Sequence, residues 1–524
     1  MKSLRTDDGN RAMSLADLIR QIPVLEAAGG STTSLPVSMI SSDSRDVLPG
    51  ALFIAVRGYS ADGHRFIKSA VERGAAAVLC EEIPPVLPDA SLPYLRVEDA
   101  RQALALAARQ FYGFASDALH VIGVTGTNGK TTTARLITAM LNACGIRTGY
   151  IGTNLCTFGE QQIPLDRTTP EAHILHALFR RMLDSGCSVA VMEVSSHALV
   201  LQRVYGITFH AAVFTNLSME HLDFHKTMQE YAGAKRQLFE QLSPQGFAVI
   251  NSDDPRAEEM VSKINPEKRF CCTLDQTGRV AGDASRRFSA ELIDQSIASA
   301  TIRLCFPDAQ QTISTVLPGQ YNVMNLLQAA AVGCGMGLGS PVVAAALDAL
   351  PGVAGRMERI MDRRRKEFVF VDYAHTPDAL FKALSTLNAL KSPASRLIVV
   401  FGCGGNRDRL KRPEMGRIAV ENADLVILTS DNPRDEDPEM IIDEIEKGIR
   451  VKNHKRITDR AQAIRTAVAL LQPGDVLLVA GKGHEQYQET AGEKSFFSDQ
   501  ETLRNALAEE NAGEPEKGAV CKGC

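Results

Sequence analysis

The sequence predicts an α/β protein with three domains: an N-terminal mixed α/β domain, a central P-loop-type domain with a mostly parallel sheet, and a C-terminal Rossmann-like α/β domain. Three observations support this fold class. The chain has 524 residues, more than one hydrophobic core usually organises. Short runs that are apolar on both faces alternate with helical patterns, as expected of buried parallel strands between helices. A glycine-rich turn joins one such run to a helical segment, as in proteins that bind phosphate groups.

The predicted elements fall into consecutive blocks. The first block, residues 1–105, mixes short strands with turns, as at Gly50–Val56. The second block, residues 106–350, alternates helical patterns with apolar runs at Leu119–Val124, Cys187–Val194, His210–Thr215 and Phe247–Ile250. The third block, residues 351–507, has further apolar runs at Phe368–Val371, Leu397–Phe401, Leu425–Thr429 and Val476–Ala480. Within it, Asp437 followed by Pro438 marks the start of a helix. Residues 508–524 are rich in Glu, Gly, Lys and Pro, which predicts a disordered tail.

Composition and charge narrow the function classes. An apolar content of 44% is ordinary, and a net charge of −5 with scattered Lys and Arg gives no indication of a nucleic-acid partner. No uninterrupted apolar run is long enough to span a bilayer. The polar start, Met1–Asn10, lacks the apolar core of a signal peptide. We therefore expect a cytoplasmic protein without a membrane span.

The cysteines point to the same compartment. The 11 cysteines are an odd number and mostly stand singly in apolar runs, which predicts reduced, buried thiols rather than a disulfide framework. Cys521 and Cys524 form a Cys-x-x-Cys pair without the second pair of a zinc site. A tail that ends in cysteine is therefore favoured over zinc binding or redox chemistry.

The most informative motif is a turn that follows Leu119–Val124; its residues are Gly126, Thr127, Asn128, Gly129, Lys130, Thr131 and Thr132. A strand, a glycine turn, a Lys-Thr pair and a helix together form a phosphate cradle, in which backbone N–H groups face the anion. The ammonium of Lys130 reaches the outer phosphates, and the Thr131 hydroxyl can bind magnesium. Val124 stands where the general P-loop pattern has its first glycine, so the alternative is a plain strand-to-helix turn.

Polar sequences follow apolar runs of the third block: Gly402–Asp408, Asp431–Arg434 and Gly481–Glu485. Ligands bind at the carboxyl ends of strands in doubly wound sheets. Each sequence alone is compatible with a solvated turn. Three of them at equivalent ends of one predicted sheet indicate a substrate-binding domain.

The second block carries further candidate ligands. Glu193 follows a strand, where a magnesium-binding carboxylate would complement Lys130 and Thr131, although a helix-start carboxylate is the structural alternative. The next strand is followed by oxygen and imidazole groups: Asn216, His221 and Asp223. Taken alone, His221 is typical of a packed or surface residue, and Lys235 of a solvated lysine in a helix.

A set of motifs extends over almost the whole chain, from Asp43-Ser44-Arg45 to Gly481–Glu485. They include Gly126–Thr132, Glu193–His197, Asn216-Leu217, Tyr231 with Ala234-Lys235, Gly355–Glu358 and Asp372–His375. Together they resemble the motifs of the Mur ligases, ATP-dependent amide-forming enzymes of peptidoglycan synthesis. Within the family, the resemblance is closest to members that add meso-diaminopimelate to UDP-N-acetylmuramoyl-L-alanyl-D-glutamate through an acyl phosphate.

The resemblance implies ATP and magnesium as cofactors. ATP would contact Gly126–Thr132 together with residues of the central and third domains: Asn322, Asn325, Arg356, Asp372 and His375. Magnesium would be bound by Thr131, Glu193 and His221. Lys235 matches the lysine that the family carbamylates with CO₂, and the resulting carboxylate could bind a second magnesium ion. Catalysis would thus depend on Lys130, Glu193, His221 and Lys235.

The resemblance also implies where the muramyl substrate binds. The uridine nucleotide would contact the first domain through Ser42, Ser44, Tyr59, Ser60 and Ala61. The muramyl dipeptide would contact Thr168, Thr169, Ser195 and Arg203. Arg167 is a departure, because some members of the family have Asn there.

Diaminopimelate would be bound by Arg407, Asp431, Asn432, Pro433, Arg434, Gly481 and Glu485. It differs from lysine by a second carboxylate, which a guanidinium binds with two parallel charge-assisted hydrogen bonds. Arg434 is therefore a suitable discriminator, and lysine-adding relatives lack an arginine at this position. Lysine would leave Arg434 unpaired, which costs about 1–3 kcal/mol or more for a buried charged donor.

The alternatives differ in how they account for these residues. The nearest are other ligases of the superfamily: the lysine-adding form, the D-Ala-D-Ala-adding enzyme and folylpolyglutamate synthetase. A non-catalytic nucleotide-binding scaffold does not explain Lys130, Glu193, His221 and Lys235 together. A motor or transporter ATPase would need a membrane or coiled segment for coupling. We expect small-molecule substrates and a monomer.

Overall fold

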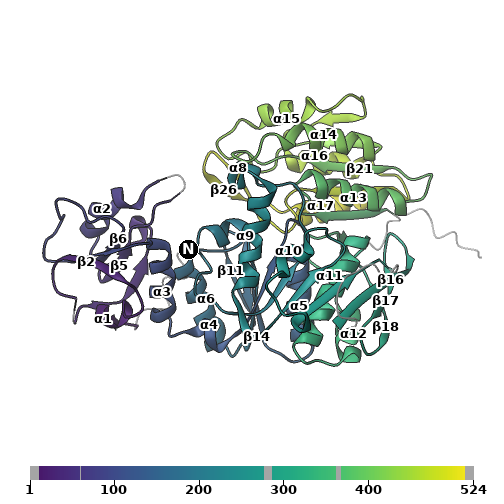
Figure 1. Ribbon diagram of the computed structural model, residues 1–524. Helices are drawn as coiled ribbons and strands as arrows, with labels where there is room; N and C mark the ends of the chain where they lie inside the picture. Colours follow the sequence, from purple (N-terminus) through teal and green to yellow (C-terminus); the bar gives the residue numbers. More distant parts are fainter. Residues whose placement is uncertain (1–10, 33, 59–60, 276–285, 362–366, 514–524) are drawn as a thin grey trace, which may run out of the picture. The chain divides into compact units, whose positions relative to one another are not determined.

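The computed structural model describes residues 11–32, 34–58, 61–275, 286–361 and 367–513 (Figure 1). The chain divides into two compact units. Unit 1 comprises Met1–Phe288 and Gln328–Ala346, and unit 2 comprises Ser289–Leu327 and Leu347–Cys524. Helix α11, Gln320–Gly335, carries the chain across this division. The domain boundaries expected near residues 105 and 350 stay predictions.

Unit 1 begins with a small sheet in the order β2-β7-β6-β5-β4. Its strands are β2 (Val24–Gly29), β4 (Met39–Ser41), β5 (Ala51–Ile54), β6 (Ala75–Cys80) and β7 (Pro93–Val97). All neighbours pair in parallel except β2, which is antiparallel to β7. Successive side chains of a strand point to opposite faces, so Leu52 packs with α3 (Ala100–Phe111) and Phe53 packs with α2 (Ile67–Glu72). A short pair, β1 (Met13–Ser14) with β3 (Pro36–Val37), and helix α1 (Leu15–Leu18) complete this part.

The larger sheet of unit 1 has the order β11-β10-β9-β12-β8-β13-β14-β15. Its strands are β8 (His120–Thr125), β9 (Thr148–Gly152), β10 (Leu155–Phe158), β11 (Gln161–Pro164), β12 (Val189–Glu193), β13 (Phe209–Phe214), β14 (Leu242–Asn251) and β15 (Arg269–Thr273). The strands from β9 to β15 in this order pair in parallel, whereas β10 and β11 form an antiparallel extension. The register aligns Glu193 with Val124, and Phe214 with Thr125. The residues that follow β12, β8 and β13 therefore meet at one edge of the sheet.

Helices cover this sheet. They are α4 (Ala115–Ala118), α5 (Lys130–Ala143), α6 (Ala172–Asp184), α7 (Ser196–Val200), α8 (Leu222–His225), α9 (Met228–Glu240), α10 (Ala257–Val261) and α12 (Ser340–Asp348). Helix α5 begins directly after Gly129, whose φ of 86° is a left-handed conformation that glycine adopts without strain. Its apolar stripe includes Leu136, Ile137 and Met140, which are buried. This stripe fixes the start of α5, and hence Lys130, against the sheet.

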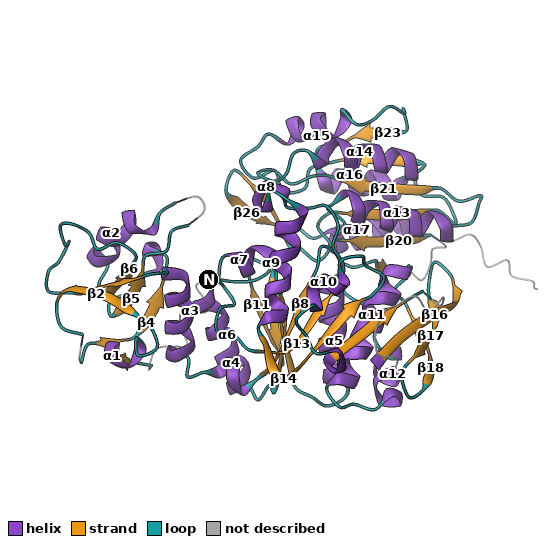
Figure 2. Ribbon diagram, viewed as in Figure 1, coloured by secondary structure: helices purple, strands orange, loops and turns teal. Residues whose placement is uncertain are grey.

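Unit 2 contains a doubly wound sheet in the order β19-β20-β24-β21-β22-β23 (Figure 2). Its strands are β19 (Glu358–Ile360), β20 (Phe368–Asp372), β21 (Leu397–Phe401), β22 (Leu425–Leu428), β23 (His454–Arg456) and β24 (Val476–Ala480). All neighbours pair in parallel except the edge strand β19. One face packs on α13 (Pro377–Leu390), α14 (Lys411–Asn422) and α15 (Pro438–Glu446), and the other packs on α16 (Arg460–Ala469) and α17 (Asp499–Gly513). Burial on both faces explains why these strands are apolar throughout.

Antiparallel strands complete unit 2. β16 (Arg287–Gln295), which begins at the division, pairs with β17 (Ala300–Cys305), and β17 pairs with β18 (Gln310–Thr315). A hairpin of β25 (Tyr487–Thr490) and β26 (Glu493–Phe496) follows β24. Its turn residues Ala491 and Gly492 have φ of 50° and 79°, as a tight hairpin turn requires. A single bridge joins this hairpin, at Thr490, to Arg434.

The predicted α/β class with mostly parallel sheets is confirmed, and each apolar run named above overlaps a strand. The expected helix start at Asp437 is also present, because its side chain accepts a hydrogen bond from the Glu439 amide at the start of α15. Within the described ranges, no helix has the length and apolar character needed to cross a bilayer. The cysteines in these ranges are free thiols, most of them buried.

The predicted disordered tail begins too early. Helix α17 continues to Gly513, past residue 508 where the sequence composition predicts the tail. The helix is anchored by Leu503, Ala506 and Leu507, which are buried in the core of unit 2. Residues 514–524, with Cys521 and Cys524, lie outside the described residues.

A buried ion pair supports the edge of the unit 2 sheet at which β22 and β24 end. The Arg460 guanidinium donates to both Asp499 oxygens at 2.8 and 2.7 Å, and both side chains are fully buried. Arg460 also donates to the carbonyl oxygens of Ser430 and Ala480, at 3.4 and 3.0 Å. The pair thus fixes the carboxyl ends of β22 and β24.

We expect Asp499→Ala to destabilise unit 2 by about 3–5 kcal/mol, because it leaves the buried Arg460 charge uncompensated. Differential scanning calorimetry would show this as a lower unfolding temperature for one transition. The matched control is Glu421→Ala, which breaks an exposed ion pair with Arg417 and should cost less than about 1 kcal/mol. Equal shifts for the two variants would contradict a structural role for the buried pair.

Candidate active site

The predicted phosphate turn lies between β8 and α5 and is closed by residues that follow β13. The Asn216 side chain accepts from the Asn128 amide and donates to the Asn128 carbonyl, both at 3.0 Å. The Thr127 amide donates to the Asn216 carbonyl oxygen at 2.8 Å. The sequence analysis expected Asn216 to supply a ligand oxygen, whereas in the structure it holds the turn in shape.

Gly126 must be glycine for this arrangement. Its φ is 147°, and a Cβ atom would lie 1.8 Å from the Thr215 hydroxyl oxygen and 3.0 Å from the Asn216 amide nitrogen. A substitution would therefore push the turn away from β13. The carbonyl oxygen of Gly126 accepts hydrogen bonds from two ammonium groups, Lys130 at 2.9 Å and Lys235 at 2.7 Å. Lys130 also donates to the Thr127 carbonyl oxygen at 2.8 Å.

Glu193 is fully buried at the end of β12 and accepts four hydrogen bonds. One carboxylate oxygen accepts from the Tyr150 hydroxyl at 2.6 Å and the Thr153 amide at 2.9 Å. The other accepts from the hydroxyls of Thr131 and Thr153, at 2.9 and 3.2 Å. Burial and the Glu193 charge raise the pKa of Tyr150 well above its usual range, so its hydroxyl remains a donor. Thr131 and Glu193, predicted as magnesium ligands, thus lie together.

The donor set at this edge fits magnesium. A hydroxyl and a carboxylate are the hard oxygen ligands that Mg²⁺ takes, usually completed by water and substrate phosphates. In the part of the chain that the structure describes, no group of three or more His, Cys, Asp or Glu side chains could hold a metal ion.

His221, the third predicted magnesium ligand, precedes α8 with a left-handed backbone (φ 58°). Its ring packs edge-on against His197, with 4.9 Å between centroids. Burial, followed by the neighbouring His197, Lys130 and Lys235, lowers the pKa of His221 to about 3. The imidazole is therefore neutral near pH 7 and retains the lone pair that a metal ligand needs. Asp223, the remaining candidate from this loop, lies in the first turn of α8.

Lys235 is buried, not solvated as a helical lysine usually is. Only 1% of the residue is exposed, and its ammonium lies 4.4 Å from the centroid of the Tyr231 ring. Burial and the nearby Lys130 lower the pKa of Lys235 well below the usual value. A larger fraction of this amine is therefore neutral than in an exposed lysine.

The residues expected to contact the muramyl dipeptide lie beside Glu193. The Thr169 hydroxyl donates to the Glu193 carbonyl oxygen at 2.9 Å and accepts from the Ser195 amide at 3.1 Å. The Arg203 guanidinium donates to the Thr169 carbonyl oxygen at 3.1 Å. The Thr168 hydroxyl lies 3.2 Å from that of Thr153. These contacts bring all four predicted residues to one edge of the sheet.

Arg203 is the cation of this group. Its guanidinium lies 3.1 Å from the Glu171 carboxylate, which also pairs with Arg167. The buried Nε of Arg203 has no partner among the described residues. Burial, only partly offset by Glu171, lowers the pKa of Arg203 to about 10. A buried donor without a partner favours binding of an anionic substrate here. Arg167, the departure noted in the sequence, thus belongs to the same ion-pair group.

The predicted uridine-binding residues belong to the small sheet of unit 1. Ser42 follows β4, and Ser44, which is buried, begins a 3₁₀ turn, Ser44–Asp46. The Ala61 carbonyl oxygen accepts from the Gly58 amide at 2.8 Å. Tyr59 and Ser60 lie outside the described residues.

The remaining predicted ATP-binding residues lie in unit 2. At the start of α11, Asn322 donates to the Pro318 carbonyl oxygen at 2.8 Å, and Asn325 donates to the Asn322 side chain at 3.2 Å. The Arg356 guanidinium lies 4.5 Å from the centroid of the Tyr373 ring. Asp372 ends β20 and accepts from the Met357 amide at 2.7 Å, and burial raises the pKa of its carboxyl group. Nδ1 of His375 lies 2.8 Å from the Tyr373 carbonyl oxygen.

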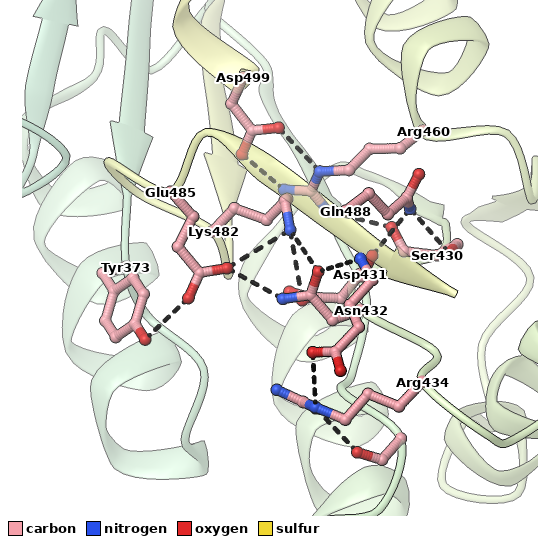
Figure 3. A network of polar contacts seen from close by, with 12 residues as sticks. Tyr373, Ser430, Asp431, Asn432, Arg434, Arg460, Lys482, Glu485, Gln488 and Asp499 are labelled. Carbon is pink, nitrogen blue, oxygen red and sulfur yellow. Dashed lines mark hydrogen bonds and ion pairs between the residues drawn. The ribbon is translucent and has the colours of Figure 1, made fainter. Parts of the chain in front are cut away.

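The predicted amino-acid site forms a buried polar network at the ends of β22 and β24 (Figure 3). Lys482 is fully buried, and its ammonium donates to the Asn432 side-chain oxygen at 2.9 Å. It also lies 3.4 Å from the Glu485 carboxylate and 3.9 Å from that of Asp431. The Glu485 carboxylate accepts from the side-chain amide of Asn432 at 2.9 Å and from the Tyr373 hydroxyl at 3.1 Å. Asp431, Asn432 and Glu485 thus come together as predicted, around a lysine that the sequence analysis did not select.

Glycine and charge shape the rest of this network. Gly481 has a φ of 114°, and a Cβ atom there would lie 2.6 Å from an Asp431 carboxylate oxygen. Burial would raise the pKa of Asp431, but the Lys482 and Arg460 charges outweigh it and hold that pKa below its usual value. Gln488 donates to the Ser430 hydroxyl at 3.0 Å and to the Asp431 carbonyl oxygen at 2.7 Å.

The predicted discriminator, Arg434, has a left-handed backbone with φ of 52°. Its guanidinium donates to the Gly405 carbonyl oxygen at 2.8 Å and lies 3.4 Å from the Glu489 carboxylate. Pro433 precedes it and accepts from the Glu436 amide at 3.0 Å. Burial and the charge of the nearby Arg434 lower the pKa of Arg407.

Lys482 and Glu489 are the charged residues that the sequence analysis missed. Lys482 lies inside a motif that was read for its glycines and Glu485, so its position was a usable signal. Glu489 lies on the hairpin strand β25, and no motif marks it. Its contact with Arg434 also corrects the expectation that a lysine substrate would leave Arg434 unpaired, because the chain itself supplies a carboxylate.

Comparisons with known proteins show which family this chain is similar to. Three family models match: "Mur ligase family, catalytic domain" at residues 36–112, "Mur ligase middle domain" at 124–333, and "Mur ligase, glutamate ligase domain" at 355–483. A Chlorobaculum tepidum protein named UDP-N-acetylmuramoyl-L-alanyl-D-glutamate--2,6-diaminopimelate ligase is 56% identical over 510 residues, which cover 97% of this chain and 100% of that one. The Geobacillus kaustophilus protein of the same name is 41% identical over 505 residues, 95% of this chain and 100% of that one.

A solved structure agrees as well. The structure of a ligase of that name has a TM-score of 0.66 and 34% identity, and the match covers 95% of this chain and 99% of that chain. The expected three-domain α/β fold, with its mostly parallel sheets, is therefore confirmed. Since the family models together match most of the sequence, and the relatives align over nearly its whole length, the chain belongs to the Mur ligase family of ATP-dependent amide-forming ligases.

Proposed function

We propose that this ligase adds meso-diaminopimelate to UDP-N-acetylmuramoyl-L-alanyl-D-glutamate in peptidoglycan synthesis. The observation that carries the proposal is that guanidinium groups and a carboxylate group lie at the ends of β21, β22 and β24. Arg434 and Arg407 present guanidinium groups, and the Asn432–Glu485 pair lies in the adjoining network. A guanidinium suits the distal carboxylate of the amino acid, and a carboxylate suits its distal ammonium. The names of the similar proteins support the same substrate.

The proposed reaction begins with phosphoryl transfer. The γ-phosphoryl group of ATP moves to one of the free carboxylates of the bound D-glutamate residue, which gives an acyl phosphate and ADP. Magnesium, when bound, neutralises negative charge on the phosphate oxygens as it shifts. Thr131 and Glu193 would hold the ion through their adjacent oxygens, with His221 as a further ligand. The Lys130 ammonium would leave the turn carbonyls and bind the transferring phosphate.

Amide formation follows. The uncharged amine of diaminopimelate attacks the acyl phosphate, and the tetrahedral intermediate expels phosphate. Residues of unit 2 position the amino acid: Arg434 and Arg407 bind the distal carboxylate, while Glu485 and the Gly481 backbone receive the distal ammonium. Thr168, Thr169, Ser195 and Arg203 would hold the muramyl dipeptide near Glu193.

Lys235 would act as a carbamate. A neutral amine attacks CO₂ and loses one proton, which forms a carbamate with one negative charge. The lowered pKa of Lys235 favours the neutral amine that this step requires. Carbamylation would also replace a buried cation next to Lys130 with an anion that can bind magnesium.

Other features support the cellular setting that we propose. The free thiols of the described cysteines suit the reducing cytoplasm. The substrates are small molecules, and we propose that the enzyme acts as a monomer. The lysine-adding form remains the second candidate, because the Arg434–Glu489 contact gives the arginine a partner without a diacid.

We expect ADP release to require UDP-N-acetylmuramoyl-L-alanyl-D-glutamate, ATP, magnesium and meso-diaminopimelate together. The purified enzyme would be assayed with each component omitted in turn, and mass spectrometry would identify the amide product. L-Lysine, D-alanyl-D-alanine and L-glutamate would replace the diacid in parallel assays. Product formed with one of these but not with diaminopimelate would overturn the proposed function.

We expect ¹³C-labelled bicarbonate to give a carbamate resonance from Lys235 in the NMR spectrum near neutral pH. Exposed lysines, with pKa values near 10.4, are almost wholly protonated there and react little. Lys235→Arg should abolish the resonance together with activity. Lys263→Arg, at an exposed lysine paired with Glu240, is the control and should retain both. A resonance that survives in Lys235→Arg would place the carbamate elsewhere.

We expect Arg434→Ala to raise the KM for diaminopimelate by about 5- to 100-fold, the effect of losing a charged hydrogen-bond partner. The KM for ATP should change by less than about twofold, since Arg434 is not among the residues expected to contact ATP. Alanine keeps the Cβ atom, so the strain at this left-handed position stays the same. Arg417→Ala, on the exposed side of α14, is the control. Comparable changes for both substrates would argue against Arg434 as the discriminator.

A further inference from the structure

The β25–β26 hairpin forms several hydrogen bonds with the segment Asn432–Arg434. The Glu489 amide donates to the Asn432 side-chain oxygen at 3.0 Å, and the Arg434 amide donates to the Glu489 carbonyl oxygen at 3.0 Å. The Ala491 amide donates to the Arg434 carbonyl oxygen at 2.7 Å. These backbone contacts place the Glu489 side chain next to the Arg434 guanidinium, with Nε and a carboxylate oxygen 3.4 Å apart.

The negative charge of Glu489 partly neutralises the positive charges of two arginines. Both partners of the contact are only partly exposed, 18% for the Arg434 side chain and 24% for Glu489, so solvent screens the interaction incompletely. Arg407 also interacts with Glu489, which partly offsets the repulsion that Arg407 experiences from Arg434. With Glu489, this group of three side chains has a net charge of +1; without the carboxylate it would be +2.

We propose that Glu489 is a specificity-determining residue, whose carboxylate competes with the distal carboxylate of the amino-acid substrate for Arg434. This inference rests on the proposed function. Glu489 lowers the affinity for the diacid, because a second carboxylate must share or replace its contact with the guanidinium. It also lets the site tolerate an amino acid without a distal carboxylate, because Arg434 then keeps a partner of opposite charge.

The Glu489 side chain is not needed to hold Arg434 in place. The guanidinium is oriented by the Gly405 carbonyl oxygen at 2.8 Å. The backbone on either side of Arg434 is fixed by the hairpin through main-chain groups. A change confined to the Glu489 carboxylate therefore removes a charge and leaves these contacts. An orienting role would predict weaker binding of the diacid after this change, whereas competition predicts stronger binding.

The test compares Glu489→Gln with Glu493→Gln. Glutamine keeps the length and shape of the side chain and removes only the charge. Glu493 lies on the neighbouring strand of the same hairpin, is exposed and pairs with Thr490 in the ladder. Steady-state kinetics would give the KM and kcat for meso-diaminopimelate and the KM for ATP. L-Lysine would be measured as an alternative substrate or as an inhibitor.

We expect Glu489→Gln to lower the KM for diaminopimelate about three- to fivefold, which matches the contribution of a partly exposed ion pair. The preference for diaminopimelate over lysine should rise by at least that factor, and the KM for ATP should stay the same. Glu493→Gln should behave like the unmodified enzyme. An unchanged or raised KM for diaminopimelate in Glu489→Gln would overturn the inference. If the unmodified enzyme makes no product with diaminopimelate, the proposed function itself fails.

Discussion

The central part of unit 1 depends on the hydrogen bonds that the Glu193 carboxylate accepts. It is buried at the end of β12, and a buried carboxylate is tolerated only when hydrogen bonds replace its water. The four donors come from the end of β9, the residues after it and the start of α5. Because all of these donors must reach the same carboxylate, they fix the start of α5 relative to the sheet. The position of the phosphate turn is thereby fixed as well. The register that aligns Glu193 with Val124 makes this possible.

In unit 2, the buried charged group with hydrogen-bond partners is a lysine. The Lys482 ammonium is buried between Asn432, Glu485 and Asp431 and orients all three. A second buried cation, Arg460, pairs with Asp499 and binds the carbonyl oxygens at the ends of β22 and β24. Charges at the ends of these strands are therefore compensated by partners that are distant in sequence. Removing one partner would affect both the fold and the site.

The sequence predicted the fold class well because its strongest signals are local. Strands buried on both faces are apolar throughout, and the turn at Gly126–Thr132 lies between a strand and a helix. The candidate site residues were predicted where a motif marks them, and the structure brings Glu193 to Thr131 and Asn432 to Glu485. Glu489 was missed because its role depends on a hairpin that returns to Arg434, which no local pattern encodes. The extent of α17 was missed because composition outweighed the buried Leu503 and Leu507.

Several groups that should bind substrates are engaged with the chain itself. Lys130 donates to two carbonyl oxygens of its own turn, and Arg434 contacts Glu489 and the Gly405 carbonyl oxygen. Each internal partner resembles the substrate group that would replace it. A phosphate oxygen would replace a carbonyl oxygen at Lys130, and a substrate carboxylate would replace the Glu489 carboxylate at Arg434. Such partners avoid the cost of a buried, unpaired charge before the substrate binds. They also reduce affinity, because a substrate gains only the difference between its own contact and the one it replaces. Selectivity at Arg434 therefore depends on Glu489 as well as on the arginine.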